Sequence, residues 1–186
     1  MKILTIAALL VLTAPIFALG QDAPDFEIGA GYSLAFLRRD YDWATYPGWR
    51  VEAARRVAPY WAFAGIVQCN YYSLVDDRFG DSESHRTYTF LAGVKTAANR
   101  RRRVMPLFQA LAGVEHSSST LRPIGVPPLD LSTNGFVVQG GTGVHVWVGS
   151  AVALEVGLDA LMRGPWYGTS WLYPEWRAGV SVVYVR

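Results

Sequence analysis

Disulfides, long apolar runs and a large net charge are all missing from this chain. Cys69 is the only cysteine among 186 residues, so an exported chain cannot form an internal disulfide. After residue 20, no apolar run approaches the roughly 20 residues that a membrane-spanning helix requires. The net charge of +2, with 17% charged residues, is too small to indicate nucleic-acid binding. The sequence therefore excludes a disulfide-rich scaffold, a helical membrane domain and a nucleic-acid-binding domain.

The first 20 residues have the features of an export signal. Lys2 is followed by an apolar run over residues 3–19, and two small residues, Ala18 and Gly20, precede the cleavage point before Gln21. A short basic start, an apolar centre and small closing residues are typical of a secretory signal peptide. We predict a signal peptide over residues 1–20 and a single mature domain over residues 21–186.

From Phe26 onward, apolar residues repeatedly alternate with small or polar ones. The clearest stretch is Ala151–Arg163, where one set of alternate positions is apolar and the other carries Glu155 and Asp159. This period of two predicts a β-strand, because a helix would mix the two sets. The charges lie on the face that a soluble sheet would normally bury, which favours a membrane β-barrel. An apolar content of 51% without long runs fits strands that meet lipid at every second residue.

Eight alternating segments follow one another, and the connections between them alternate in length. The segments lie near Asp25–Leu37, Trp49–Val57, Tyr60–Tyr72, Thr87–Ala98, Met105–His116, Gly135–Trp147, Ala151–Met162 and Glu175–Arg186. Every second connection is short, and the remaining ones are long: Arg38–Gly48, Ser73–Arg86, Ser117–Asn134 and Arg163–Pro174. Lipid cannot hydrogen-bond a backbone, so a sheet that crosses it must close on itself. We predict an all-β fold, an eight-stranded antiparallel up-and-down transmembrane β-barrel with long loops at its extracellular rim.

The polar face of these segments predicts what fills the barrel. Acids and bases occur there in nearly equal number, and glycines such as Gly113 and Gly141 share the face and leave room for long side chains. An unpaired buried ion costs several kcal/mol, and an eight-stranded barrel is just filled by its side chains, so the charges must pair. The phase of the fifth segment stays open, because Leu107 and Leu111 share the face of Glu115. We predict a salt-bridged, plugged lumen whose charge network comprises Glu27, Arg50, Glu52, Lys95, Glu115, Glu155, Asp159, Arg163, Glu175 and Arg177.

Three stretches carry a resemblance to a known family, namely Tyr88–Lys95, Met105–Val114 and Gly140–Val146. With the export signal and the alternating segments, they resemble the small outer-membrane β-barrel proteins of Gram-negative bacteria, the porin-like OmpA/OmpX-type barrel domains. The resemblance covers essentially the whole mature chain. It implies insertion by the outer-membrane insertion machinery and contact with outer-membrane lipid and lipopolysaccharide. It implies no particular activity, because one fold hosts many functions.

One motif admits a catalytic interpretation. His116-Ser117-Ser118 resembles the catalytic motif of barrel-type lipid A deacylases, in which a His base activates a Ser nucleophile. The same residues read better as the start of a polar loop, so we predict no catalytic residue and no enzyme. The three histidines lack the spacing of a metal-ligand set, and we predict no metal and no cofactor.

Aromatic residues in the long connections are the strongest signal of a partner. The predicted loop aromatics are Trp43, Tyr46, Trp166, Tyr167 and Trp171. Exposed rings near Gly and Pro suit adhesion or carbohydrate contact. We predict a non-enzymatic outer-membrane barrel with a structural, adhesive or binding role toward an unidentified extracellular ligand.

Three other interpretations remain open from the sequence. The first is a narrow pore for small solutes, and the second is a lipid A-modifying hydrolase that uses His116 and Ser118. The third is a soluble lipocalin-like barrel, in which the apolar faces would point inward and the charged faces outward.

Overall fold

The computed structural model describes residues 26–39, 42–76, 81–97, 103–123, 125–164 and 174–186. These ranges form strands β1 (Phe26–Arg39), β2 (Asp42–Ala58), β3 (Trp61–Asp76), β4 (Asp81–Thr96), β5 (Val104–Arg122), β6 (Leu129–Trp147), β7 (Val152–Arg163) and β8 (Glu175–Val185). Among the described residues, no helix is long and apolar enough to cross a membrane. The predicted signal peptide, residues 1–20, lies outside the described residues.

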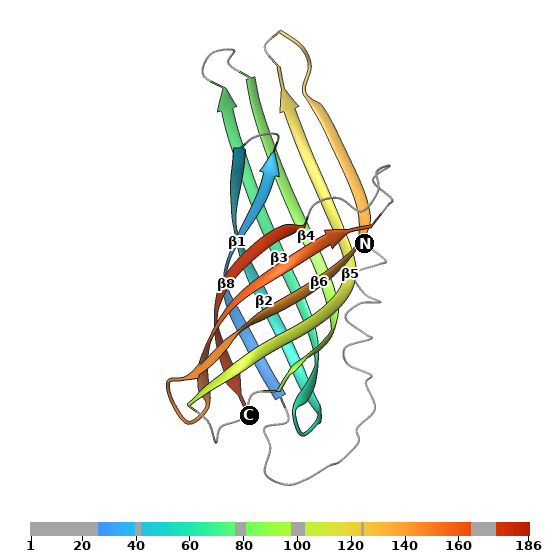
Figure 1. Ribbon diagram of the computed structural model, residues 1–186. Coiled ribbons are helices and arrows are strands. Elements are labelled where there is room, and N and C mark those ends of the chain that lie inside the picture. Colours follow the sequence, from blue (N-terminus) through green and yellow to red (C-terminus); the bar gives the residue numbers. More distant parts are fainter. Residues whose placement is uncertain (1–25, 40–41, 77–80, 98–102, 124, 165–173) are drawn as a thin grey trace.

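Each strand pairs antiparallel with its neighbours in sequence, and β1 pairs with β8 to close the barrel (Figure 1). The closing seam runs from Glu27 opposite Val185 to Phe36 opposite Trp176. The predicted eight-stranded antiparallel up-and-down barrel is therefore confirmed. We call the end where β2 joins β3, β4 joins β5 and β6 joins β7 the lower rim. The opposite end is the upper rim, as in Figure 1.

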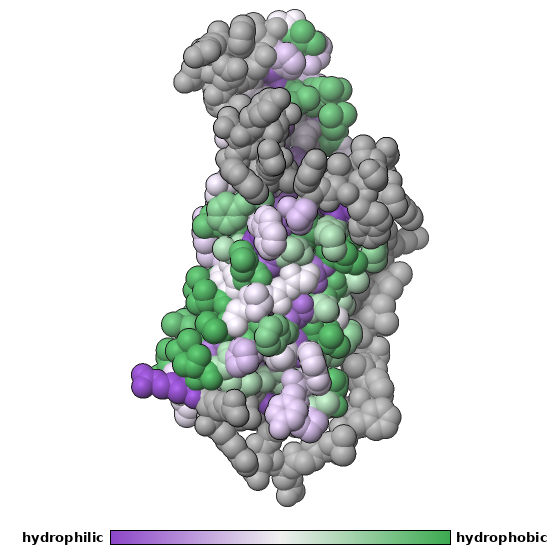
Figure 2. Space-filling view, viewed as in Figure 1, coloured by the Kyte–Doolittle hydropathy of each residue, from purple (hydrophilic) through white to green (hydrophobic). Residues whose placement is uncertain are grey.

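The outer wall is apolar and the inside is charged. On β7, Leu154, Val156 and Leu158 are exposed, whereas Glu155 and Asp159 are buried. Hydrophobic side chains cover much of the barrel wall below the hairpins that protrude from the upper rim (Figure 2). This arrangement is the reverse of a lipocalin-like barrel, so that interpretation is wrong.

Side-chain burial also determines which face of the fifth segment points into the barrel. Leu107 and Leu111 are buried inside the barrel on the same face of β5 as Glu115, whereas Phe108 is exposed on the outer wall. The buried apolar residues form two patches. The larger consists of Ala54, Ala62, Ala64, Ile66, Leu91, Ala97, Leu111, Val137 and Leu161, and the smaller consists of Trp147, Ala153, Val183 and Val185. The lumen is therefore packed by apolar side chains as well as by charged ones.

Three of the four predicted long loops are largely strand. The chain reverses between Arg39 and Asp42, between Asp76 and Asp81, and between Arg122 and Leu129. The β3–β4 and β5–β6 hairpins rise beyond the rest of the upper rim (Figure 1). The prediction failed because most of these extensions lack a sustained alternation of apolar and polar residues. Polar residues such as Ser82 and Glu83, which are adjacent on β4, take both faces of the strand there.

Glycines on the inner face allow the strands to approach closely, and Gly113 offers a test. A Cβ at this position of β5 would collide with the backbone carbonyl oxygen of Phe90 on β4. Backbone cannot give way as a flexible side chain can, so Gly113→Ala should lower the free energy of unfolding by about 1–3 kcal/mol.

The matched control is Gly140→Ala, because a Cβ on Gly140 has no heavy atom within 4 Å. Its effect should stay within about 0.5 kcal/mol. Urea unfolding of the barrel in phospholipid vesicles measures both variants. Equal losses in the two variants would mean that β4 and β5 are not packed this closely at Gly113.

Candidate functional site

A group of charged side chains lies inside the barrel on the side of the lower rim, and we call it the basal cluster. It consists of Glu27, Arg50, Glu52, Lys95, Glu155 and Asp159. The Lys95 Nζ lies 2.8 Å from Glu52 Oε1 and 3.0 Å from Glu155 Oε2. It is also 3.5 Å from Glu27 Oε2. Lys95, on β4, therefore links strands on opposite sides of the lumen.

Arg50 is the second cation of the basal cluster. Its Nη2 lies 2.6 Å from Glu52 Oε2 and 3.2 Å from Glu155 Oε1. Its Nη1 lies 3.3 Å from Asp159 Oδ2. The guanidinium therefore crosses from β2 to β7, and its planar fork of donors serves three carboxylates at once.

A second group, the rim cluster, lies near the upper rim and consists of Glu115, Arg163, Glu175 and Arg177. The Arg163 Nε lies 2.6 Å from Glu115 Oε1, and its Nη2 lies 2.7 Å from Glu175 Oε2. Arg177 contacts the same two carboxylates, at 2.5 Å from Glu175 Oε1 and 3.3 Å from Glu115 Oε2. Two guanidiniums thus alternate with two carboxylates in a ring with no net charge.

All ten residues predicted for the lumen network take part in these ion pairs. Two neutral side chains that the prediction left out of the network join it. Gln109 Nε2 donates a hydrogen bond to Asp159 Oδ1, at 2.5 Å. The Thr89 hydroxyl accepts from Arg177 and donates to Glu115. Both share the inward phase of their strands, which is the signal that could have identified them.

The two clusters differ in charge balance. The rim cluster has two cations and two carboxylates, whereas the basal cluster has two cations and four carboxylates. His145 is completely buried beside the basal cluster, with Nε2 3.5 Å from Glu155 Oε2. The basal cations are therefore the groups on which the stability of this part of the lumen depends most.

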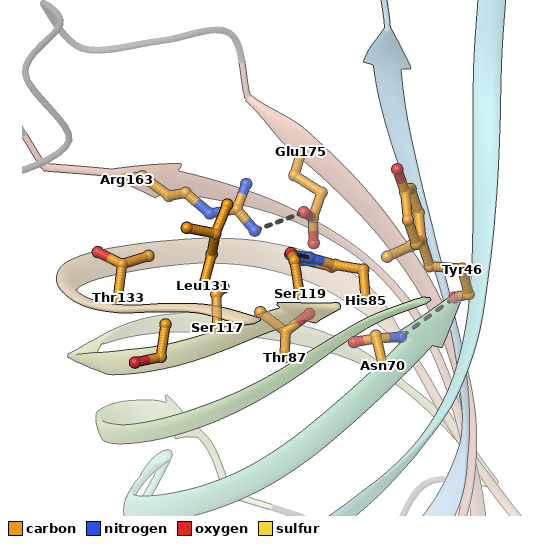
Figure 3. A pocket seen from close by; sticks show the side chains of 12 residues that line it. Tyr46, Asn70, His85, Thr87, Ser117, Ser119, Leu131, Thr133, Arg163 and Glu175 are labelled. Atoms are coloured by element: carbon orange, nitrogen blue, oxygen red, sulfur yellow. Dashed lines mark hydrogen bonds and ion pairs between the residues drawn. The ribbon is translucent and has the colours of Figure 1, made fainter. Parts of the chain in front are cut away.

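Above the rim cluster, the lumen opens into a cavity of about 490 Å³, which we call the vestibule (Figure 3). Arg163 and Glu175 of the rim cluster are among the residues that line it. Its walls carry hydroxyl and amide side chains from β3 to β6, together with one tyrosine from β2. The lining residues are Ala35, Tyr46, Asn70, His85, Thr87, Ser117, Ser119, Leu131, Ser132, Thr133, Arg163 and Glu175.

The structure corrects the prediction that Tyr46 lies in an exposed loop. Tyr46 belongs to β2, is only 8% exposed and lines the vestibule. Its ring packs against Tyr72, with 4.9 Å between centroids, and lies 6.4 Å from the His85 ring. The extension of β2 beyond the predicted boundary turns this side chain inward.

The other predicted loop aromatics are not placed by the structure. The backbone of Trp43 is part of β2, and its side chain lies outside the described residues. Trp166, Tyr167 and Trp171 also lie outside the described residues.

His85 sits in the vestibule wall with Nδ1 2.6 Å from Ser119 Oγ. Burial and the nearby Arg163 guanidinium both lower the pKa of its imidazole, against smaller opposing effects of Glu115, Glu83 and Glu175. The imidazole is therefore neutral at pH 7, and it adds no charge to the vestibule.

The catalytic interpretation of His116-Ser117-Ser118 finds no support in the geometry. His116 Nδ1 lies 2.8 Å from Asn134 Oδ1, and the Ser118 hydroxyl contacts the Arg86 carbonyl oxygen at 3.5 Å. Within the described part of the chain, no hydrogen bond joins His116 to Ser118. The described residues also contain no group of three or more His, Cys, Asp or Glu side chains that could hold a metal ion.

No protein-family model matches the chain, and no curated protein matches it in sequence. Solved structures do match. The attachment invasion locus protein Ail of Yersinia pestis, solved with the heparin analogue sucrose octasulfate, is 11% identical with a TM-score of 0.63. That match covers 88% of this chain and 98% of Ail.

Two further solved structures also match the chain. Neisserial surface protein A is 15% identical with a TM-score of 0.61, over 86% of this chain and 96% of its own. OprG, an outer membrane protein of Pseudomonas aeruginosa, is 11% identical with a TM-score of 0.56, over 90% of this chain and 98% of its own. The chain therefore has the fold of the small outer-membrane β-barrel proteins, as the sequence resemblance implied.

The charge balance of the basal cluster generates a prediction. Lys95→Met should lower the free energy of unfolding by about 3–5 kcal/mol, because the cluster's four carboxylates would then face Arg50 alone. Urea unfolding in phospholipid vesicles, followed by tryptophan fluorescence, measures this loss.

Asp159→Asn is the matched control at the same depth of the lumen. It removes one of the surplus carboxylates and keeps an amide that can still bond Gln109, so its cost should stay below about 1.5 kcal/mol. If Asp159→Asn cost as much as Lys95→Met, the surplus of negative charge in the cluster would not be real.

Proposed function

We propose that this chain is a non-enzymatic outer-membrane β-barrel protein whose lumen is closed by ion pairs and whose outer end binds a partner. The observation that carries this proposal is the inversion of the two faces. Apolar side chains such as Val180 and Val182 cover the outer wall, and ten charged side chains pair inside. Such a surface is stable in a bilayer and would aggregate in water. Residues 1–20 would direct export, and the outer-membrane insertion machinery would then place the barrel in lipid and lipopolysaccharide.

The ion pairs support a lumen that does not conduct. Arg50 and Lys95 reach across from β2 and β4 to Glu155 on β7. Nearer the upper rim, Arg163 on β7 reaches Glu115 on β5. These contacts cross the lumen at two levels, and an eight-stranded barrel has little further space to open a pathway.

The protruding hairpins support a binding role at the outer end. On β6, residues 129–135 pair with β5 alone, so their other backbone edge has no partner among the described residues. Leu129 and Leu131 on this edge are half exposed. A free edge with apolar side chains suits an extended segment of a partner protein that adds to the sheet. Trp43, Trp166, Tyr167 and Trp171 are proposed to contribute further contact area.

Membrane residence can be tested by fractionation. The protein should appear in the outer-membrane fraction of expressing cells. Its band on SDS gels should shift on boiling, because a closed barrel resists SDS until heat opens it. A soluble protein whose band does not shift would overturn the proposed location.

A closed lumen predicts silence in planar bilayers. The folded barrel should give no unitary conductance steps, because ion pairs cross the lumen at the basal and rim clusters. A porin with a wide lumen in the same bilayer serves as the positive control. Reproducible steps from the heat-modifiable protein would favour the narrow pore instead.

A further inference from the structure

The wall of the vestibule is built from rows of side chains that face one another across strands. One row joins Asn70, Thr87, Ser117 and Thr133 on β3 to β6, and the row above it includes Tyr72, His85, Ser119 and Leu131. Directly paired residues project to the same face of a sheet. These rows therefore line one continuous inner surface above the rim cluster (Figure 3).

Two hydroxyls of the lower row are free to bond a ligand. Thr87 and Ser117 are only 5% and 7% exposed, and both line the vestibule. Within the described part of the chain, neither hydroxyl has a hydrogen-bond partner. Asn70, in contrast, is occupied, because its Nδ2 donates to Ser33 Oγ and to the Tyr46 carbonyl oxygen. Buried polar groups nearly always find a partner, so two open hydroxyls side by side indicate a place for one.

The charges of the lining exclude a strongly ionic ligand. Arg163 already contacts the carboxylates of Glu115 and Glu175, and Glu175 also contacts Arg177. His85 is neutral at pH 7, as argued above. An anion or a cation in the vestibule would thus lose its hydration without meeting an unpaired counter-charge among the described lining residues.

We propose that the vestibule binds a small neutral polyhydroxylated ligand, of the class of a hexose or a disaccharide. Hydroxyls of the ligand would bond to Thr87 and Ser117, and its C–H face would pack against the Tyr46 ring. The cavity volume of about 490 Å³ lies within the ordinary range for small-molecule sites. Leu131 belongs both to the vestibule and to the β6 edge, but the proposed ligand contacts are Thr87, Ser117 and Tyr46 on other strands. The site therefore does not depend on the proposed partner of the protruding hairpins.

The test uses the full mature barrel, folded in detergent, and saturation-transfer NMR. The neutral probes are glucose, galactose, N-acetylglucosamine and maltose, and the charged probes are glucose 6-phosphate and glucosamine. At least one neutral probe should give a saturable signal that exceeds the signals of the charged probes. Failure of every neutral probe, or equal binding of the charged ones, would overturn the proposal.

The double variant Thr87→Val with Ser117→Ala should weaken binding of the neutral probe by about tenfold or more, since two hydrogen bonds are lost. Thr142→Val is the matched control, because Thr142 is an exposed residue of the outer wall on β6 and should leave binding unchanged. The boiling shift shows that each variant is folded. Unchanged affinity in a folded double variant would also overturn the proposal. Because the assay contains neither membrane nor partner protein, its failure is distinct from failure of the proposed function.

Discussion

Closure of the sheet through the β1–β8 seam determines what the rest of the structure must do. In lipid, every backbone donor and acceptor needs a partner within the protein, and a closed barrel provides one for all of them. With eight strands the interior is narrow, so a long side chain that points inward meets the opposite wall. Arg50 on β2 therefore reaches Asp159 on β7. Charged side chains inside the barrel have no access to bulk water, so they must form ion pairs for the barrel to fold.

The inner glycines make this pairing sterically possible. A Cβ on Gly29 would lie 2.8 Å from the Cγ of Glu52, and a Cβ on Gly141 would collide with the carboxylate of Asp159. Each of these acids thus leans over a glycine of the neighbouring strand. Small and long side chains alternate around the wall, and the packing of the lumen and its charge balance therefore depend on the same positions. Removal of one partner from such a buried network destabilises the fold strongly, because the remaining charged groups stay buried without a counter-charge.

The sequence predicted the strands, the closure and the two faces wherever one face meets lipid and the other meets the lumen. The prediction from sequence failed above the upper rim, where it assigned Ser82 and Ser84 to a loop although they belong to β4. Tyr46 was misplaced because the adjacent Pro47 and Gly48 are typical of turns. The partners of individual ions were also beyond prediction. Alternation along a strand does not specify the stagger between strands, which decides that Lys95 meets Glu155.

The vestibule follows from side-chain length. Up the inner face of β5, the residues change from Glu115 to Ser117 and then Ser119. Glu115 is long enough to reach two guanidiniums across the lumen, so the barrel is filled at its level. A serine is too short to cross the same space, and Thr87, which pairs with Ser117 on the neighbouring strand β4, is equally short. Successive inward positions carry shorter side chains, and the lumen therefore opens above the rim cluster into a cavity lined mainly by uncharged side chains.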